Sequence, residues 1–258
     1  MNNNQVKLPG SAPKNFFGAA IPLLLLLTLV IGGAGYLVFY FQKKSITEHI
    51  HKELMTVADL KVSQIVNWRA ERRGDAVMAG KDSFLARAVE HWLQDGAPVD
   101  ENRSRILRRL NTLQQTNRYH NIFIIDPEQI VRLSSRPNNE AVGDLSLGLA
   151  REVLKSGDTV FSPLQRMKSG PDSNIFLDLL TLLTVTDGTG GRIAGVMLFR
   201  IDPALFLYPL IQSWPTTSNT AETLLIKRNG GDVVYLNELR FRKNAALNLR
   251  FPATERQL

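Results

Sequence analysis

The sequence predicts an α+β fold in which a transmembrane helix and a long helical stalk precede an antiparallel sheet with flanking helices. Three observations predict it. A charge-free apolar stretch lies near the N-terminus, and apolar residues then recur at three- and four-residue steps to about residue 113. From residue 121 onward, runs of β-branched and aromatic residues alternate with turn residues.

The composition narrows the function classes. The chain has 258 residues, 44% of them hydrophobic, which is enough for one or two globular units. The net charge of +7 suits either nucleic acid or an anionic membrane, and the apolar stretch favours membrane lipid, so we expect no nucleic-acid partner. The absence of cysteine excludes disulfides, thiolate metal sites and cysteine nucleophiles, and suits an oxidising compartment.

The apolar stretch, residues 16–41, is long enough to span a bilayer. As a helix it covers about 39 Å, more than the roughly 30 Å of the hydrocarbon core. Tyr36 and Tyr40 suit the interfacial belt at its far end. A cleaved signal peptide is the alternative, but the apolar region is too long for one and continues past the small residues 32–35. We therefore expect an uncleaved anchor.

Charge does not orient this anchor. Lys7 and Lys14 lie before it, while Lys43 and Lys44 follow it directly. The positive-inside rule therefore favours neither side.

Helical segments follow the span. Apolar residues from Ile46 to Trp68 form one face of an amphipathic helix, which we expect Gly74 to interrupt or bend. Further helices are expected over 83–94, capped by Asp82 and closed by Gly96, and after the cap Asp100.

The second half of the sequence predicts strands and short helices. We expect strands over 121–126 and 130–135, a helix over 148–156 ended by Gly157, and a strand beginning at 159–161. A long apolar hairpin over 175–202 turns at TDGTGG, a helix runs from Asp202 to about Gln212, and a linker covers 215–220. A final hairpin turns at Asn229 and Gly230.

These elements divide the chain into parts. The final hairpin is marginal by itself in water, so we expect the chain to be a fragment or truncated product of something longer. The expected parts are an N-terminal tail (1–15), a transmembrane helix (16–41), a helical stalk (42–118), an α+β unit (119–213), and a linker with an incomplete further unit (214–258).

Two segments carry a family resemblance. KVSQIVNWRAERRGDA (61–76) and RIDPALFLYPLIQSWPTTSNTAETLLI (200–226), on this plan of elements, resemble the double Cache sensor domain of bacterial histidine kinases, diguanylate cyclases and chemoreceptors. The resemblance covers 46–252 and implies a PAS-like Cache sheet followed by the start of a second Cache-like unit. It also implies an inner (cytoplasmic) membrane location with the residues after 41 in the periplasm. Such receptors have a second span and an output domain, which this sequence lacks.

Polar residues embedded in apolar strands are the candidate ligand-binding residues. Asp178 is the clearest, because a carboxylate among apolar neighbours is costly unless it is paired or binds something. Arg132 and Arg166 are candidate counter-charges, and Tyr119 could place a phenol at the pocket mouth. The alternatives are an internal salt bridge or a solvent-facing strand side for the charged residues, and an ordinary helix-end aromatic for Tyr119.

No pattern for catalysis, cofactor or metal stands out. His49 and His51 are two apart on a helix and do not face one metal, while His91 and His120 lack partners. TDGTGG lacks the following lysine of a phosphate loop, and no Ser-His-Asp set is visible. We expect no enzyme activity, no cofactor and no metal, with Asp202 serving as a helix cap.

The leading functional hypothesis is a membrane-anchored sensor that binds a small solute, anionic or zwitterionic if the arginines line the pocket, and relays the signal across the membrane. The stalk pattern predicts a homodimer. One alternative is a membrane-anchored PAS-like protein-interaction scaffold without a small-molecule ligand. Another is that a kinase or cyclase output belongs to the full-length parent protein.

Overall fold

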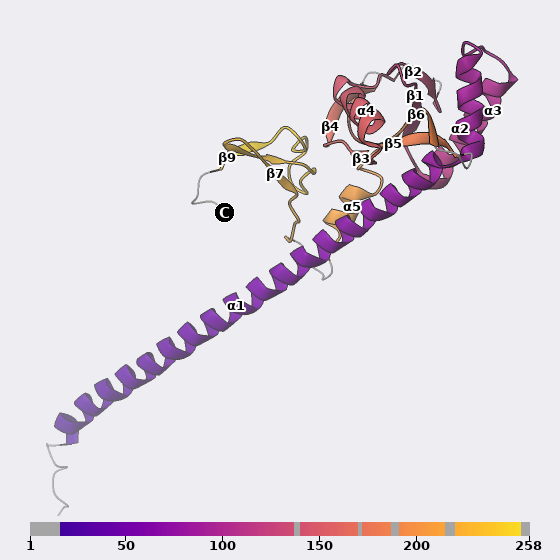
Figure 1. Cartoon of the computed structure of the whole chain (residues 1–258). Coiled ribbons are helices and arrows are strands. Elements are labelled where there is room, and N and C mark those ends of the chain that lie inside the picture. Colours follow the sequence, from indigo (N-terminus) through magenta and orange to yellow (C-terminus); the bar gives the residue numbers. More distant parts are fainter. Residues whose placement is uncertain (1–15, 137–139, 170–171, 187–190, 215–219, 254–258) are drawn as a thin grey trace, which may run out of the picture. The chain divides into compact units, whose positions relative to one another are not determined.

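The computed structural model describes residues 16–136, 140–169, 172–186, 191–214 and 220–253 (Figure 1). The chain divides into two compact units, residues 1–57 and residues 58–258. The expected tail 1–15, most of the TDGTGG turn and most of the 215–220 linker lie outside the described residues.

The described residues of the first unit, 16–57, all lie in one helix. Helix α1 (Phe16–Gly80) begins there and continues into the second unit. Within the described residues, α1 alone is long and apolar enough to cross a membrane, with a mean hydropathy of 2.3 in a window that is not buried. It fits a single membrane span. The helix is continuous through Gly74, so an interruption there, one of the two expected outcomes, was wrong. Nothing lies within 4 Å of a Cβ built at Gly74, so the glycine serves no close approach.

Two capped helices follow within the second unit. Helix α2 (Ser83–Gln94) has the predicted bounds, and the Asp82 carboxylate accepts from the backbone N–H groups of residues 84 and 85. Helix α3 (Glu101–Asn117) is capped by Asp100, as predicted. Both caps satisfy backbone donors that have no partner inside their helix.

A six-stranded antiparallel sheet forms the centre of the second unit. Its order is β2-β1-β6-β5-β3, and β4 also pairs with β5. The long hairpin of β5 and β6 is the predicted one. The bounds are β1 (Asn121–Ile125), β2 (Val131–Ser134), β3 (Val160–Phe161), β4 (Gln165–Ser169), β5 (Asp172–Thr186) and β6 (Gly191–Ile201).

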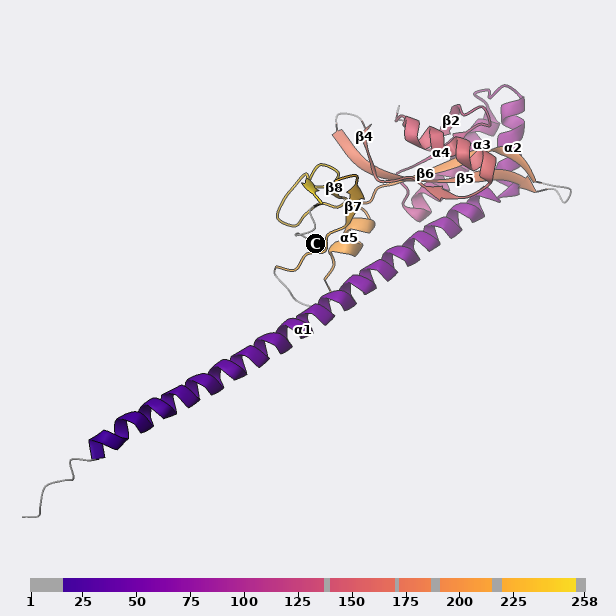
Figure 2. The same ribbon diagram turned by 60° about the vertical axis from the view of Figure 1, so that its left-hand side comes forward.

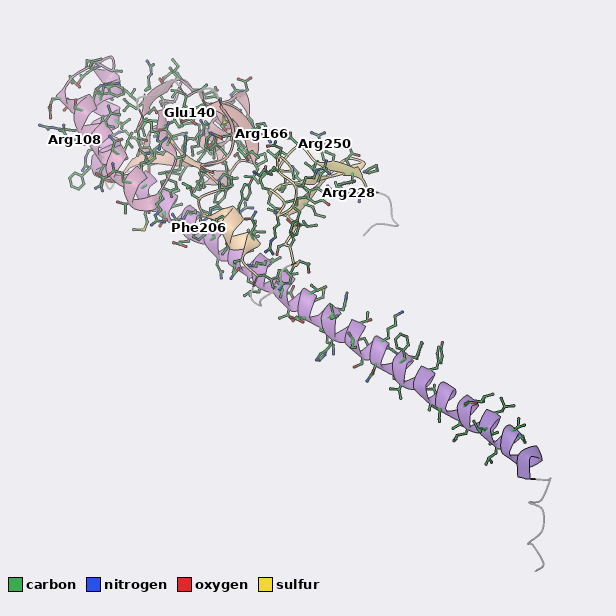
Figure 3. The ribbon with its side chains drawn as sticks, turned by 180° about the vertical axis from the view of Figure 1, so that it is seen from behind. Arg108, Glu140, Arg166, Phe206, Arg228 and Arg250 are labelled. Atoms are coloured by element: carbon green, nitrogen blue, oxygen red, sulfur yellow. The ribbon has the colours of Figure 1, made fainter. Side chains whose placement is uncertain are left out.

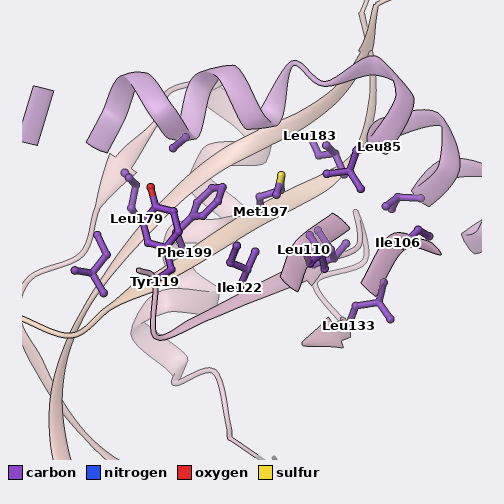
Figure 4. Close-up of a cluster of buried hydrophobic side chains, with 14 of the residues drawn as sticks. Leu85, Ile106, Leu110, Tyr119, Ile122, Leu133, Leu179, Leu183, Met197 and Phe199 are labelled. Atoms are coloured by element: carbon purple, nitrogen blue, oxygen red, sulfur yellow. The ribbon is translucent and has the colours of Figure 1, made fainter. Parts of the chain in front are cut away.

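The two faces of the sheet carry different cores. One face packs against α1, α2 and α3 and is apolar; Ile106 and Leu110 of α3 contact it, beside the sheet residues labelled in Figure 4. We call it the helical face. The opposite face packs against α4 (Asp144–Ser156), through Ala150 and Val153 (Figure 2). We call it the α4 face. This α+β architecture confirms the predicted fold class.

The chain leaves the sheet through a short helix and ends in a small second sheet. Helix α5 (Leu207–Gln212) begins five residues after the expected cap, and Asp202 instead closes a turn by accepting from the N–H of Ala204. The small sheet has the order β7-β8-β9, and its first turn lies at Gly230 and Gly231, one residue beyond the predicted position. Its bounds are β7 (Ile226–Asn229), β8 (Asp232–Tyr235) and β9 (Arg250–Pro252).

Candidate functional site

Three neighbouring strands place one polar residue each in a row across the α4 face. Arg200 of β6 lies opposite Asn121 of β1 on one side and opposite Asp178 of β5 on the other. All three residues are fully buried. Because side chains alternate along a strand, the row continues the face that holds Phe123, Leu180 and Leu198. We call the group around it the Arg200 cluster: Arg200, Asp178, Glu140, Asn121, Ser146 and Gln165.

Arg200 is held by two carboxylates. Its Nε and one terminal nitrogen donate to the two oxygens of Asp178 at 2.9 and 3.0 Å, a bidentate arrangement. The other terminal nitrogen donates to Glu140 at 2.9 Å and to the carbonyl of Ala141 at 3.0 Å. Burial opposes the charge of Arg200, but the two carboxylates outweigh it and raise the pKa of the guanidinium.

Two aromatic rings complete the surroundings of this guanidinium. Its central carbon lies 5.0 Å from the ring centroid of Phe123 and 5.4 Å from that of Phe176. Both distances are within the range of cation–π attraction. The guanidinium is therefore fixed in position by ring faces as well as by carboxylates.

Glu140 reaches the cluster from the segment before α4. Its second oxygen accepts from the Asn121 amide at 2.9 Å and lies 3.4 Å from the His120 ring nitrogen. Burial raises the pKa of this carboxyl, but the His120 ring nitrogen 3.4 Å away and the hydrogen bonds from Asn121 and Arg200 together outweigh burial and bring the pKa to about 2. Glu140 is therefore ionised at neutral pH.

Asp178 also binds helix α4 and the neighbouring strand β4. Ser146 of α4 donates to it at 2.7 Å and Gln165 of β4 at 3.3 Å. The backbone N–H of Asp178 donates to the hydroxyl of Ser162. The side chain of Asp178 thus contacts α4, β4 and β6, so a change in its hydrogen-bond partners would alter the position of all three elements.

The Arg200 cluster contains more carboxylates than guanidinium groups. Asp178 and Glu140 contribute two negative charges against the single positive charge of Arg200. The His120 ring, 3.4 Å from Glu140, is one partner for this excess of negative charge, and the ammonium group of a ligand is another because it can donate to both carboxylates. The arrangement is therefore complementary to a ligand that carries an ammonium group.

The structure separates the four residues that the sequence singled out. Asp178 is buried in the cluster, but its counter-charge is Arg200, so the suggestion that Arg132 or Arg166 supplies it was wrong. Sequence reasoning also missed Glu140, Asn121, Ser146 and Gln165. The apolar setting that drew attention to Asp178 also surrounds Arg200, between Phe199 and Ile201, so the same argument could have found Arg200.

Arg132 lies at the other end of the β1–β2 hairpin. Its Nε donates to Asp126, whose other oxygen accepts from the N–H of Ile130 and closes the turn. Asp126 is five residues beyond Asn121 along one strand, a separation of about 16 Å. The pair therefore has a turn-closing role at a distance from the cluster.

Arg166 projects from the opposite side of β4 to Gln165 and donates to the carbonyl of Ala246 at 2.8 Å. It therefore links β4 to the segment between β8 and β9.

Tyr119 belongs to the helical face. Its ring lies 4.9 Å from the ring of Phe199, and burial raises the pKa of its phenol to about 12. The residue borders a cavity of about 270 Å³ that Arg72, Asp202 and Phe206 also line. Tyr119 thus adjoins a cavity on the face away from Asp178, and its role in ligand binding stays a prediction.

No group of three or more histidine or carboxylate side chains that could hold a metal is found among the described residues. The carboxylates of the Arg200 cluster already accept from a guanidinium, which is a poor setting for a metal ion.

Comparisons with known proteins bear on the fold. No protein-family model matches the sequence, and no curated protein matches it. The ligand-binding domain of the Pseudomonas fluorescens chemoreceptor CtaA, in complex with L-isoleucine, aligns over 80% of this chain and 75% of its own, with 10% identity and a TM-score of 0.51.

Two further solved domains align less closely. The sensory domain of the Campylobacter jejuni chemoreceptor Tlp3 aligns over 68% of this chain and 69% of its own, with 17% identity and a TM-score of 0.48. The sensor domain of the V. cholerae histidine kinase DctB aligns over 65% and 60%, with 17% identity and a TM-score of 0.44. The chain also spans 60% of the Tlp3 ligand-binding domain in complex with 4-methylisoleucine.

Among the domains named here, the CtaA domain has a TM-score above 0.5 and shares the fold of this chain. The resemblance to Cache-type sensor domains that the sequence indicated is confirmed at the level of the fold, and the chain has the fold of a bacterial receptor's ligand-binding domain.

Proposed function

We propose that this chain is the membrane-anchored sensor of a receptor, and that it binds a small solute with an ammonium group, such as an amino acid, at the Arg200 cluster. The observation that carries the proposal is the buried pairing of two carboxylates with one guanidinium. The L-isoleucine bound to the CtaA domain, which shares the fold, supports an amino acid as the ligand class. Neither the geometry nor the fold provides a reaction for the chain to catalyse, so we propose no enzyme activity for it.

In this proposal the ligand enters by exchange. Its carboxylate takes the place of Glu140 on Arg200, and its ammonium group is shared between Glu140 and Asp178. Asp178 is therefore a proposed ligand contact, joined by Arg200 and Glu140. Ligand contacts by Arg132, Arg166 and Tyr119 stay predictions, because the side chains of these residues contact groups outside the Arg200 cluster.

The cluster is connected to the stalk at two points. Strand β6 leads through Asp202 to α5, and the buried ammonium of Lys61 on α1 donates to the carbonyl of Leu210 at 2.7 Å and to Ser213 at 2.9 Å. At the other point, Gly80 of α1 lies directly against the backbone of β5 at Leu182. A ligand that shifts β5 or β6 would thereby bias the position of α1.

The membrane arrangement belongs to the same proposal. Residues 16–41 would cross the inner (cytoplasmic) membrane, with 1–15 in the cytoplasm and the remainder in the periplasm. The stalk of 42–118 would support the distal unit 119–213 and pair with a second copy, and 214–258 would begin the membrane-proximal unit. The output, a kinase, a cyclase or a chemoreceptor signalling domain, would belong to a longer protein.

The proposal is tested by titrating the full chain in lipid nanodiscs with L-isoleucine, with its amine analogue lacking the carboxylate, and with its acid analogue lacking the ammonium group. A ligand at 100 times its dissociation constant raises the free energy of unfolding by about 2.7 kcal/mol. We expect the amino acid to stabilise the protein most, the amine less, and the acid not at all.

Two variants locate the effect. Asp178→Asn should abolish stabilisation by the amino acid, whereas Arg132→Gln, which alters an ion pair outside the cluster, should preserve it. Equal stabilisation of the Asp178→Asn variant, or a response to the acid analogue alone, would refute binding at the Arg200 cluster.

One observation favours a second function, that of a PAS-like interaction scaffold without a small ligand. The cluster side chains satisfy one another and are fully buried without any ligand. If no member of a wide panel of amino acids, amines and organic acids stabilises a cooperatively folded sample, the scaffold is the better account.

A further inference from the structure

A second cavity lies on the opposite side of β5 from the Arg200 cluster, where the small β7–β9 sheet meets α1 and the central sheet. It has a volume of about 500 Å³. Its walls come from α1, the segment between β3 and β4, β5, α5 and the small sheet, and we call it the junction cavity. This volume falls within the range of about 300 to 1,000 Å³ typical of small-molecule sites.

The interior of the junction cavity is apolar. Trp68 of α1, Leu177 of β5 and Leu207 of α5 are buried residues that form its inner wall. The small sheet contributes Val234 and Leu236 from the opposite side. Such a lining favours a ligand with an apolar body, because burial of apolar surface is favourable without any directed bond.

The rim of the junction cavity is cationic. Strand pairing places Lys227 of β7 opposite Val234 of β8, and Val234 opposite Arg250 of β9, so both cations share the cavity face of the small sheet. Arg69 of α1 adds a third cation, with its guanidinium carbon 4.8 Å from the ring centroid of Phe161. These three side chains are exposed, and none forms an ion pair within the described part of the chain.

No aspartate or glutamate lines the junction cavity, so its three cations raise the local positive potential without opposition from its own walls. We propose that the junction cavity binds an organic monocarboxylate with an aromatic or branched apolar body. The body fills the space against Trp68 and Leu207, and the carboxylate is held by Lys227 and Arg250. A membrane lipid with two acyl chains is too large for this volume, which favours a soluble acid.

This site is independent of the Arg200 cluster in both place and charge. The cluster carries excess carboxylates and selects an ammonium group, whereas the junction cavity carries cations and selects an anion. A ligand in the junction cavity would contact Leu177, the residue directly before Asp178, from the helical face of the sheet.

The test is calorimetric titration of the full chain in lipid nanodiscs with 1-naphthoate as the probe, with empty nanodiscs subtracted. The matched probe 1-naphthylmethylamine has the same ring and the opposite charge. We expect one naphthoate per chain and at least about tenfold weaker binding of the amine, the effect of losing charge-assisted hydrogen bonds. Affinity should also fall as salt rises.

Variants on the small sheet complete the test (Figure 3 labels two of the residues). Lys227→Gln with Arg250→Gln should weaken naphthoate binding about tenfold or more. Arg228→Gln is the matched control, because Arg228 lies on the same strand as Lys227 but does not line the cavity, and it should leave the affinity unchanged. Val234→Phe should fill the cavity and abolish binding.

Equal affinity for the two probes would overturn the proposal, as would equal weakening by Arg228→Gln and by the paired variant. Asp178→Asn should leave naphthoate binding intact, so a failure at the junction cavity and a failure at the Arg200 cluster are distinguishable.

Discussion

The two faces of the central sheet use alternate residues of the same strands, yet they are stabilised in different ways. On the helical face, Ile122, Leu179 and Phe199 pack with α1, α2 and α3 in an apolar core. On the α4 face, the residues adjacent to these three in the same strands are Asn121, Asp178 and Arg200 of the Arg200 cluster. Their buried polar groups are stabilised by hydrogen bonds and ion pairs. The helical face therefore depends on volume, and the α4 face depends on charge pairing.

The sharpest test of this difference removes the guanidinium. Arg200→Met leaves Asp178 and Glu140 buried without their cation, and we expect it to lower the free energy of unfolding by about 3 to 5 kcal/mol. Denaturant unfolding of the full chain in nanodiscs measures the change. This is the largest change in unfolding free energy that we predict for any variant.

A compensating variant separates charge from packing. Asp178→Leu and Glu140→Gln added to Arg200→Met remove the unpaired charges, and replacing a buried ion-pair network by apolar groups is often neutral or stabilising. We therefore expect the triple variant to recover most of the loss. A triple variant as unstable as Arg200→Met alone would show that packing, not charge, governs the α4 face.

The pH dependence of stability gives the next largest effect. The pKa of Glu140 falls from its ordinary value of 4.5 to about 2 in the folded state, because hydrogen bonds and the charge of Arg200 outweigh burial. A depressed folded-state pKa adds stability that is present above pH 4.5 and is lost as the pH falls toward 2. At 1.36 kcal/mol per unit this is about 3 kcal/mol.

Comparison with Glu140→Gln isolates this contribution. The wild-type protein should exceed the variant in unfolding free energy at pH 7, and the difference should shrink steadily between pH 4.5 and 2. A difference that stays constant over this window would show that Glu140 acts through its shape and not its charge.

Features that depend on residues close in sequence could be predicted, and features that depend on tertiary contacts could not. The caps Asp82 and Asp100 and the bounds of α2 were predicted correctly, because a cap acts within three residues. The long hairpin was also predicted, since its two apolar runs flank a turn. An interruption at Gly74 was predicted wrongly, because a long helix tolerates one isolated glycine. The start of α5 was also predicted wrongly, because Asp202 closes a turn instead of capping the helix.

The Arg200 cluster was harder to predict for a geometric reason. Near the turn, Thr184 pairs with Ile193, but one residue farther along Leu183 pairs with Gly195, so Ala194 forms a bulge. Counted from the turn without this bulge, Asp178 would face Phe199. The bulge moves Asp178 into register with Arg200. A one-residue slip exchanges the two faces of a strand, so no local pattern could decide the pairing.

Glu140 was missed for another reason. It lies between β2 and α4 in a segment without helical or strand periodicity, and only tertiary contact brings it to Arg200. Ser146 and Gln165 are ordinary polar residues of a helix and a strand by sequence. Their role at Asp178 exists only once α4 packs on the sheet and β4 pairs with β5.

The smallest predicted effect tests the claim that the helical face depends on volume. A Cβ built at Gly80 would lie 2.2 Å from the carbonyl oxygen of Leu182 on β5, so α1 and β5 would have to separate. We expect Gly80→Ala to lower the free energy of unfolding by about 1 to 3 kcal/mol, as overpacking does.

Gly74→Ala is the matched control on the same helix, since nothing lies within 4 Å of its new methyl group. It should raise the stability by about 0.5 to 1 kcal/mol because alanine favours a helix over glycine. Opposite signs for two identical substitutions six residues apart would show that space alone decides the outcome on this face, whereas equal signs would mean that helix propensity dominates.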